Sequence, residues 1–429
     1  MTANKRIYLC LAHMSDAGLE QKYIKEAFDT NWVVPLGPNV NGFEKDLEEF
    51  CGQNKRVVAL SAGTAAVHLA LIACGVKPGD EVCVQSFTFC ASSHPITYLG
   101  ATPIFIDSEK DTWNMDPELL EEAIKDRIAK TGKKPKAIVP VALYGMPYNV
   151  DRIMEIANKY DIPVVEDAAE GFGSRFNGQV LGTFGKYGVL SFNGNKMITT
   201  SGGGALITNN EDEWREIMMY ATQYRESYPY YQHEKIGFNY RMSNICAGIG
   251  RGQMTVVNDH IAHHKKVQKM YEELLAGVPG IAVHSQPKGH TDSTDSTDKV
   301  PVFDSNYWLC TITLDPSLRI KGQENSYKTI VTGAVGGAAG VIHAASSAVT
   351  DCQPNDNVEA LRVFMDAAGV EARPLWKPMH KQPCYKDAPA YLNGVSEAMF
   401  KVGMCLPAGP YVSEDDVRYI VDTIKAAII

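Results

Sequence analysis

The stretch Val189-Leu-Ser-Phe-Asn-Gly-Asn-Lys-Met-Ile-Thr-Thr-Ser-Gly-Gly-Gly204 holds a single lysine, Lys196, between an apolar run and a glycine triplet. About thirty residues earlier, the apolar run Ile162-Pro-Val-Val165 leads to Asp167. Such a run is typical of a buried parallel strand, and ligands of open α/β sheets gather at the carboxyl ends of these strands. A lysine amine can hold an aldehyde cofactor as a Schiff base, and an acidic partner keeps a pyridine nitrogen protonated. Lys196 and Asp167 together therefore predict a pyridoxal phosphate (PLP) enzyme.

Two neighbouring features support this interpretation. Ser191 lies five residues before Lys196 and is placed to offer a hydroxyl to the cofactor phosphate. The glycines at 202–204 lack β-carbons, so the backbone can pass closely beneath the ring. A lone lysine is usually a solvated charge, and an aspartate after a strand usually caps a turn. The prediction thus depends on the combination and not on either residue alone.

An earlier segment, residues 56–75, passes from a short apolar run through Ser61-Ala-Gly-Thr64 into a helix rich in alanine and leucine. A strand, a glycine turn and a helix N-terminus offer free backbone amides to a phosphate, although an ordinary capped helix has the same pattern. The next unit, residues 79–93, again predicts a strand followed by a helix. It places Phe87 at the carboxyl end of the strand, where a ring can stack on a pyridine.

With these motifs in place, the chain resembles the DegT/DnrJ/EryC1/StrS sugar aminotransferases of PLP fold type I over nearly its whole length. The resemblance implies an α/β fold with a mostly parallel central sheet flanked by helices, plus a smaller α+β C-terminal domain. The motifs that carry it lie at residues 35–46, 63–64, 86–89, 100–107, 141–147, 166–170, 191–204, 237–243, 372–380 and 406–410.

The resemblance also implies roles for individual residues. Lys196 matches the Schiff-base lysine, Asp167 the pyridinium partner and Phe87 the stacking ring, while Glu170 stands where many members carry Gln or His near the cofactor. The phosphate binders of the family match Gly63, Thr64 and Ser191. Positions near the sugar nucleotide match Arg241, Arg373 and His380.

The asparagine matching Asn239 reaches the phosphate of the neighbouring subunit's cofactor in the family. The resemblance therefore implies an obligate homodimer with shared active sites.

The lysine itself indicates the reaction, because related dehydratases carry histidine at the position of Lys196. The resemblance thus favours transamination from L-glutamate to a nucleotide-linked keto sugar. It is greatest to enzymes that aminate C4 of a UDP-2-acetamido-4-keto-2,6-dideoxyhexose for capsule, lipopolysaccharide or glycan biosynthesis. Two alternatives remain open: a PLP-dependent dehydratase or lyase of the same fold, and a non-catalytic binding protein. The second would be expected to have lost Lys196 or Asp167, and both are present.

Composition agrees with a large enzyme. The 429 residues, 45% of them hydrophobic, are enough for a large core and two domains. The net charge of −9 argues against nucleic acid as a partner. Ten cysteines without a Cys-x-x-Cys pair predict no metal site and suit free thiols in the cytoplasm. The N-terminal apolar run is too short for a convincing signal peptide, which also favours a cytoplasmic enzyme.

The predicted organisation is an N-terminal segment at 1–30 that packs on the body, a large PLP-binding domain at 31–256 and a small domain at 257–429. A Gly/Ala-rich insertion near 320–355 departs from the family pattern. Its residues 329–350 carry no formal charge, yet their many glycines make a membrane helix improbable, so we predict packing on the small domain or at the dimer interface.

Two polar segments receive simpler interpretations. The repetitive stretch at 287–298 predicts a loop that does not pack. His260, His263 and His264 resemble a metal cluster but have no acidic or cysteine partner nearby, so a solvated helix face is preferred.

Overall fold

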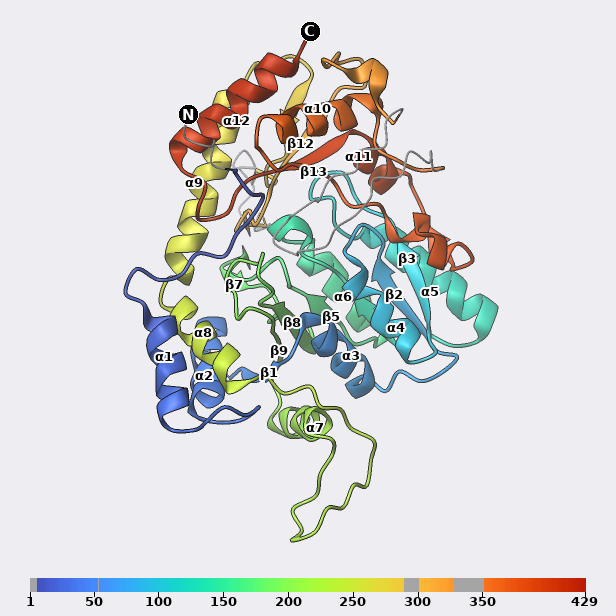
Figure 1. Cartoon of the computed structure of the whole chain (residues 1–429). Helices are drawn as coiled ribbons and strands as arrows, with labels where there is room; N and C mark the ends of the chain where they lie inside the picture. Colours follow the sequence, from blue (N-terminus) through green and yellow to red (C-terminus); the bar gives the residue numbers. More distant parts are fainter. Residues whose placement is uncertain (1–5, 53, 289–300, 328–350) are drawn as a thin grey trace, which may run out of the picture.

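The computed structural model describes residues 6–52, 54–288, 301–327 and 351–429 (Figure 1). Two four-stranded sheets form its centre, with the strand orders β14-β3-β2-β4 and β5-β8-β9-β1. Parallel bridges from Ile138 to Val164 and from Val141 to Asp167 connect the β4 and β5 edges. The strands are β1 (Arg56–Leu60), β2 (Glu81–Gln85), β3 (Thr102–Ile106), β4 (Ala137–Val139), β5 (Val165–Asp167), β8 (Tyr187–Ser191), β9 (Gly204–Thr208) and β14 (Ala390–Tyr391).

Strand direction follows the prediction. The neighbours β14 and β3, β3 and β2, β2 and β4, and β5 and β8 are parallel, whereas β9 runs antiparallel to both β8 and β1. Parallel neighbours require crossover connections, which are mostly helical here. The predicted mostly parallel sheet with flanking helices is confirmed.

The helices of this part begin where the sequence provides caps. The Asp116 carboxylate accepts hydrogen bonds from the amides of Glu118 and Leu119, and Pro117 takes the first helical position, an order of residues typical of a helix start. The helices are α3 (Gly63–Ala73), α4 (His94–Tyr98), α5 (Pro117–Thr131), α6 (Val150–Tyr160) and α7 (Glu211–Ala221). Short 3₁₀ turns lie at η1 (Cys90–Ser92), η2 (Leu143–Gly145), η3 (Gln323–Asn325), η4 (Met379–Lys381) and η5 (Pro383–Tyr385). Three further helices, α1 (Leu19–Asp29), α2 (Pro38–Cys51) and α8 (Asn244–Met254), pack together at one corner (Figure 1).

A second core lies beneath an antiparallel sheet of order β10-β12-β15-β13. Its strands are β10 (Ile281–Val283), β12 (Cys310–Leu314), β13 (Arg373–Pro374) and β15 (Gly403–Leu406), and its helices are α9 (Val257–Leu275), α10 (Asp356–Ala367), α11 (Val395–Val402) and α12 (Glu414–Ala427). Ile7 joins this core and bridges to Val370. The predicted domain boundary at 256 stays a prediction. The chain returns to the large sheet after this boundary, since β14 pairs with β3.

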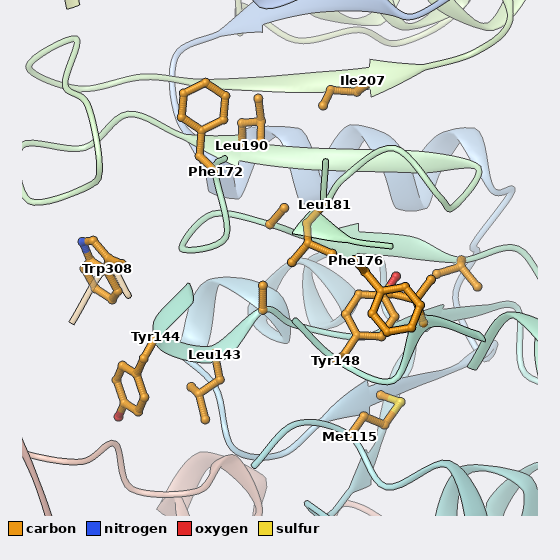
Figure 2. Packing of buried hydrophobic residues seen from close by; sticks show 14 of the residues in the cluster. Met115, Leu143, Tyr144, Tyr148, Phe172, Phe176, Leu181, Leu190, Ile207 and Trp308 are labelled. Atoms are coloured by element: carbon orange, nitrogen blue, oxygen red, sulfur yellow. The ribbon is translucent and has the colours of Figure 1, made fainter. Parts of the chain in front are cut away.

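The larger core fills the space between the central sheet and the segments that follow its strands. Figure 2 shows Leu190 of β8 and Ile207 of β9 with Leu181 and Phe176, while Trp308 lies at one side of the cluster. A small antiparallel sheet of β6 (Arg175–Phe176), β7 (Gln179–Val180) and β11 (Phe303–Asp304) adjoins it.

The histidines of α9 correct a prediction. His260 and His264 are 5% and 0% exposed, so the solvated helix face was wrong for both. Their rings hydrogen-bond to backbone carbonyls, with Nδ1 of His260 3.2 Å from the Met197 oxygen and Nδ1 of His264 3.1 Å from the Tyr307 oxygen. A polar ring can be buried when it is paired in this way.

Within the described ranges, no helix is both long and apolar enough to cross a bilayer. The predictions for the segment at 329–350, and for most of the loop at 287–298, lie outside the described residues.

Candidate active site

The predicted site residues gather at the carboxyl edge of the central sheet. Phe87 follows β2, Asp167 ends β5 and Ser191 ends β8, so neighbouring parallel strands deliver them to one edge. Lys196 lies five residues beyond β8, in the turn that leads to β9. This edge is where open α/β sheets bind ligands.

The Lys196 amine lies between an acid and an aromatic ring. Its Nζ is 3.4 Å from Oε1 of Glu170 and 4.2 Å from the centre of the Trp308 ring. Only 12% of the lysine side chain is exposed, against 3% for Glu170. The indole Nε1 of Trp308 donates to the carbonyl of Asn195 at 2.7 Å, which fixes the ring beside the amine. The amine is thus a shielded cation held by a carboxylate and a π face.

Asp167 is buried and hydrogen-bonded at both oxygens. Ser92 of η1 donates its hydroxyl to Oδ2 at 2.6 Å, and the amide of Ala169 donates to Oδ1 at 3.1 Å. Burial raises the pKa of Asp167, while these donors and the charge of Lys196 oppose the rise. A carboxylate in this setting is well suited to pair with a cationic ring nitrogen.

Glu170 connects the lysine to a strained turn. Burial raises its pKa to about 7, although the charge of Lys196 opposes the rise. Its Oε2 accepts the amide hydrogen of Tyr144 at 2.6 Å. Tyr144 has φ of +54°, which is rare for an aromatic residue and typical of over-determined sites. The Tyr144 hydroxyl in turn accepts the amide hydrogen of Trp376 at 2.9 Å.

The turn before α3 has the shape of a phosphate cradle. No side chain caps α3, so the first amides of this helix remain for a ligand. A β-carbon on Gly63 would lie 3.0 Å from Cβ of Ser191, and one on Gly204 would lie 2.4 Å from the carbonyl carbon of Ala62. Thr64 begins the helix beside Gly63 and is half-buried. The cradle, the buried carboxylate and the shielded amine fit the three parts of PLP.

The two aromatic residues of the 86–89 motif have different surroundings, and the stacking role of Phe87 stays a prediction. Phe87 is 0% exposed, and its ring lies perpendicular to that of Tyr144 with 6.4 Å between the ring centres. Phe89, two residues later, is 54% exposed and its ring centre lies 5.4 Å from that of Trp376. The chain leaves the sheet after β2, and therefore the second aromatic of the motif, not the first, faces the open edge. Phe89 also directly precedes η1, which carries Ser92 to Asp167.

The three predicted sugar-nucleotide residues have different surroundings. His380 Nδ1 lies 2.6 Å from the hydroxyl of Ser86, next to the carboxyl end of β2. The Arg373 guanidinium is 43% exposed and pairs with Glu371 at 2.7 Å. His380 therefore lies at the strand end that carries Phe87, whereas Arg373 lies in β13 of the second sheet.

Arg241 bridges to Leu60 at the end of β1, and its guanidinium is bound within the fold. Its Nη1 donates to Glu44 at 2.5 Å and to the carbonyl of Ala59 at 3.0 Å, and only 9% of its side chain is exposed. This buried ion pair fastens α2 to β1 and leaves the guanidinium committed within the fold.

Asn239 is exposed and lies in the loop between α7 and α8, where it bridges to Thr222 just after α7. Figure 1 shows this loop projecting from the body. This loop also exposes Tyr228, Tyr230, Tyr231 and Ile236, at 50% to 87% of their surfaces.

Sequence reasoning missed Trp308, Tyr144, Ser92 and Phe89. Phe89 and Tyr144 lie in the family motifs at 86–89 and 141–147. Trp308 comes from a part of the chain without a motif, more than a hundred residues after Lys196. In the described ranges, no group of three or more His, Cys, Asp or Glu side chains could hold a metal ion.

Comparison with known proteins gives one answer. The model of the DegT/DnrJ/EryC1/StrS aminotransferase family matches residues 15–317 and 323–425. EpsN of Bacillus subtilis (strain 168), named as a pyridoxal phosphate-dependent aminotransferase, is 40% identical over 98% of this chain and 95% of its own length. A GDP-perosamine synthase of Caulobacter vibrioides is 32% identical over 96% of both chains. A crystal structure of a DegT DnrJ EryC1 StrS aminotransferase from Brucella abortus is similar with a TM-score of 0.78 and 26% identity, over 96% of this chain and 95% of that one.

The family model thus covers most of the chain, and the similar proteins match it from end to end. The chain belongs to the DegT/DnrJ/EryC1/StrS aminotransferase family.

Proposed function

We propose that this aminotransferase uses PLP to move an amino group from L-glutamate to C4 of a UDP-2-acetamido-4-keto-2,6-dideoxyhexose. The observation that carries the proposal is the amine of Lys196, shielded between Glu170 and Trp308 at the edge where Asp167 ends β5. A lysine amine, a buried carboxylate and an uncapped helix start are the partners that an aldehyde, a pyridine nitrogen and a phosphate require.

Each residue then has a task. PLP, when bound, supplies a ring that draws electrons away from the α-carbon of the amino-acid substrate. Asp167 would hold the proton on the ring nitrogen, and Gly63, Thr64 and Ser191 would bind the phosphate. Lys196 would anchor the cofactor covalently and, once displaced by glutamate, carry the α-carbon proton on Nζ.

Glu170 would act on the lysine directly. Its carboxylate lies 3.4 Å from Nζ, within ion-pair distance of the amine. Because burial brings the pKa of Glu170 to about 7, the charge beside Lys196 changes within the neutral pH range. Trp308 would exclude water from one side of the amine.

Two similarities bear on the choice of the acceptor sugar nucleotide. The similarity of the 191–204 motif to UDP-4-keto aminotransferases favours a UDP-linked sugar, while the similarity to a GDP-perosamine synthase favours a GDP-linked one. The half-buried Arg373 and His380 offer a cation and a polar ring to the diphosphate or sugar of either. The common class is a nucleotide-linked keto sugar.

The test is a direct assay with purified enzyme, PLP and L-glutamate. UDP-2-acetamido-4-keto-2,6-dideoxyhexose is offered beside GDP-linked and TDP-linked 4-keto-6-deoxy sugars, and 2-oxoglutarate and the amino sugar are followed by mass spectrometry. The proposal expects turnover with the UDP sugar and none with Lys196→Ala. Preferential turnover of the GDP sugar would refute the nucleotide assignment but not the reaction type.

The lyase alternative predicts another product. A dehydratase would release a sugar lighter by one water and would form no stoichiometric 2-oxoglutarate. Glutamate is added before any sugar, because the transaminase hypothesis expects glutamate alone to convert the cofactor to the pyridoxamine form with release of 2-oxoglutarate. A protein that binds PLP without either change would be the non-catalytic alternative.

We also propose a homodimer with shared sites, supported by the projecting loop that carries Asn239 (Figure 1). If Asn239 of one protomer serves the site of the other, mixing Lys196→Ala with Asn239→Ala protomers creates hybrid dimers with one intact site. Random exchange would restore about a quarter of the wild-type sites, because half of the dimers are hybrid. If the mixture stays as inactive as the separate variants, Asn239 serves its own subunit's site or none.

A further inference from the structure

Two backbone carbonyls flank the predicted catalytic lysine, and both are held from outside its loop. The carbonyl of Asn195 accepts the indole hydrogen of Trp308 at 2.7 Å, and the carbonyl of Met197 lies 3.2 Å from Nδ1 of His260. Lys196 lies between these two residues. Its backbone is therefore fastened on both sides, once by the residue that covers the amine and once by α9.

Helix α9 also holds the segment that carries Trp308. Nδ1 of His264 lies 3.1 Å from the carbonyl of Tyr307, the residue directly before Trp308. Tyr307 has φ of +49°, so its backbone is in a conformation that non-glycine residues rarely adopt. Further hydrogen bonds fix the same turn, from the amide of Tyr307 to Oγ of Ser305 and from the amide of Trp308 to Oδ1 of Asn306.

The chemistry of both contacts is the same. A carbonyl oxygen can only accept, so each ring must carry its hydrogen on Nδ1. His260 and His264 lie one helical turn apart, about 6 Å along the axis of α9. One rigid element thus contacts the loop of Lys196 at one turn and the loop of Trp308 at the next.

We infer that His260 and His264 are positioning residues that set the spacing between the Lys196 amine and the Trp308 ring. The inference rests on the proposed function, because it gives the reason for that spacing. Trp308 closes the arrangement, since it donates to the lysine loop while its ring lies 4.2 Å from Nζ. Removal of either histidine donor frees one side of this arrangement and leaves a buried carbonyl without its partner.

Neutral histidines suit this role. Burial lowers the pKa of His264 to about 3 and also lowers that of His260, which favours the neutral form of both rings. The Nε2 atom of His264 has no hydrogen-bond partner among the described residues. Its ring interacts with the backbone of Tyr307 and of Trp308, so both contacts fall on the segment that carries the indole.

The test compares leucine and asparagine at each position. Leucine removes the donor, whereas the asparagine Nδ2 can take the place of the histidine Nδ1. His263 provides the matched control, because it lies on the same helix but faces the backbone of Gly409 and Val412. His264→Phe replaces the leucine variant if leucine prevents folding.

The first readout needs no cofactor. Hydrogen–deuterium exchange of the cofactor-free protein should accelerate at 193–200 in His260→Leu and at 305–310 in His264→Leu, and at neither segment in His263→Leu. The second readout is PLP titration followed by absorbance, where each leucine variant should bind about tenfold more weakly because a buried acceptor is left unpaired. Asparagine should restore both readouts.

The outcomes separate the inference from the proposed function. A wild-type protein that shows no lysine-bound PLP band would refute the cofactor assignment, and exchange would still decide the role of the histidines. Unchanged exchange at both segments, unchanged PLP affinity, or asparagine variants that behave like leucine variants would each overturn the inference.

Discussion

Replacement of Glu170 by glutamine provides the sharpest test of the electrostatics at this site. The carboxyl is 4% exposed, and burial raises its pKa from 4.5 to about 7 despite the nearby lysine. Below pH 4.5 the group is protonated in both the folded and the unfolded protein, so it contributes no penalty. As the pH rises toward 7, the Glu170 carboxyl loses its proton in the unfolded protein but keeps it in the folded protein. The free energy of unfolding therefore falls.

The size of the effect follows from the two pKa values. Each unit of difference corresponds to about 1.4 kcal/mol, so ionised Glu170 lowers the free energy of unfolding by roughly 3 kcal/mol above pH 7. Glutamine keeps an oxygen for the Tyr144 amide but has no charge to bury. The stability that Glu170→Gln gains over wild type should therefore be larger at pH 8 than at pH 4.5, by roughly 3 kcal/mol.

The assay is urea unfolding of the cofactor-free protein at half-unit steps from pH 4.5 to 8. Asp259→Asn, at an exposed position of α9, serves as the control for general charge effects. If the stability difference between Glu170→Gln and wild type does not change with pH, the carboxyl is not kept protonated by burial and the reasoning fails. A difference of opposite slope would mean that Lys196 dominates and holds Glu170 ionised.

Four further substitutions test other parts of the site. Phe87→Ala should lower the free energy of unfolding by about 3 kcal/mol or more because its ring is fully buried. Phe89→Ala should change the free energy of unfolding by less than about 1 kcal/mol but weaken PLP binding about tenfold. Urea unfolding measures the stability of both variants, and absorbance titration measures PLP binding. Gly204→Ala should displace the turn at Ala62, reducing stability by about 1–3 kcal/mol and PLP affinity with it; unaltered affinity would contradict the cradle. Arg241→Met should lower stability by about 3 kcal/mol by leaving its carboxylate partner unpaired, with KM for both substrates unchanged.

The parts of the fold that could be predicted are those whose signals are local. The strand before Asp167 follows the apolar run at 162–165, β2 before Phe87 has the apolar centre Val-Cys-Val at 82–84, and the cap at Asp116 is a short-range hydrogen-bond pattern. The approximate position of Lys196 follows from the same logic, since it lies just beyond β8 at the carboxyl edge. Strand ends in a parallel sheet determine a shared edge, which is why a single sequence carries this information.

Other features depend on contacts that are distant along the chain. The choice between Phe87 and Phe89 depends on where the chain leaves the sheet after β2, and this follows from the η1 turn that brings Ser92 to Asp167. Arg241 was assigned to the substrate because of its motif, but Glu44, almost two hundred residues earlier, takes its charge. No periodicity or spacing in the sequence reports such pairs.

The cofactor-binding groups and the groups that cover them come from different parts of the chain. Asp167, Lys196 and the turn before α3 all lie between residues 56 and 204, whereas Trp308 and Trp376 come from beyond residue 300. Tyr144 reaches from one set to the other, because its amide donates to Glu170 and its hydroxyl accepts from Trp376.

This division explains where the strained residues lie. Tyr144 and Tyr307 both have positive φ. Tyr144 accepts a hydrogen bond from Trp376 of the other set, whereas Tyr307, directly before Trp308, is held by His264 of α9. Backbone strain of about 1–3 kcal/mol persists only where surrounding contacts over-determine the conformation. The shielded environment of Lys196 is therefore a product of the whole chain: residues 56–204 alone contain the predicted cofactor ligands, but they do not contain the ring that excludes water from the lysine or the histidines that hold it in place.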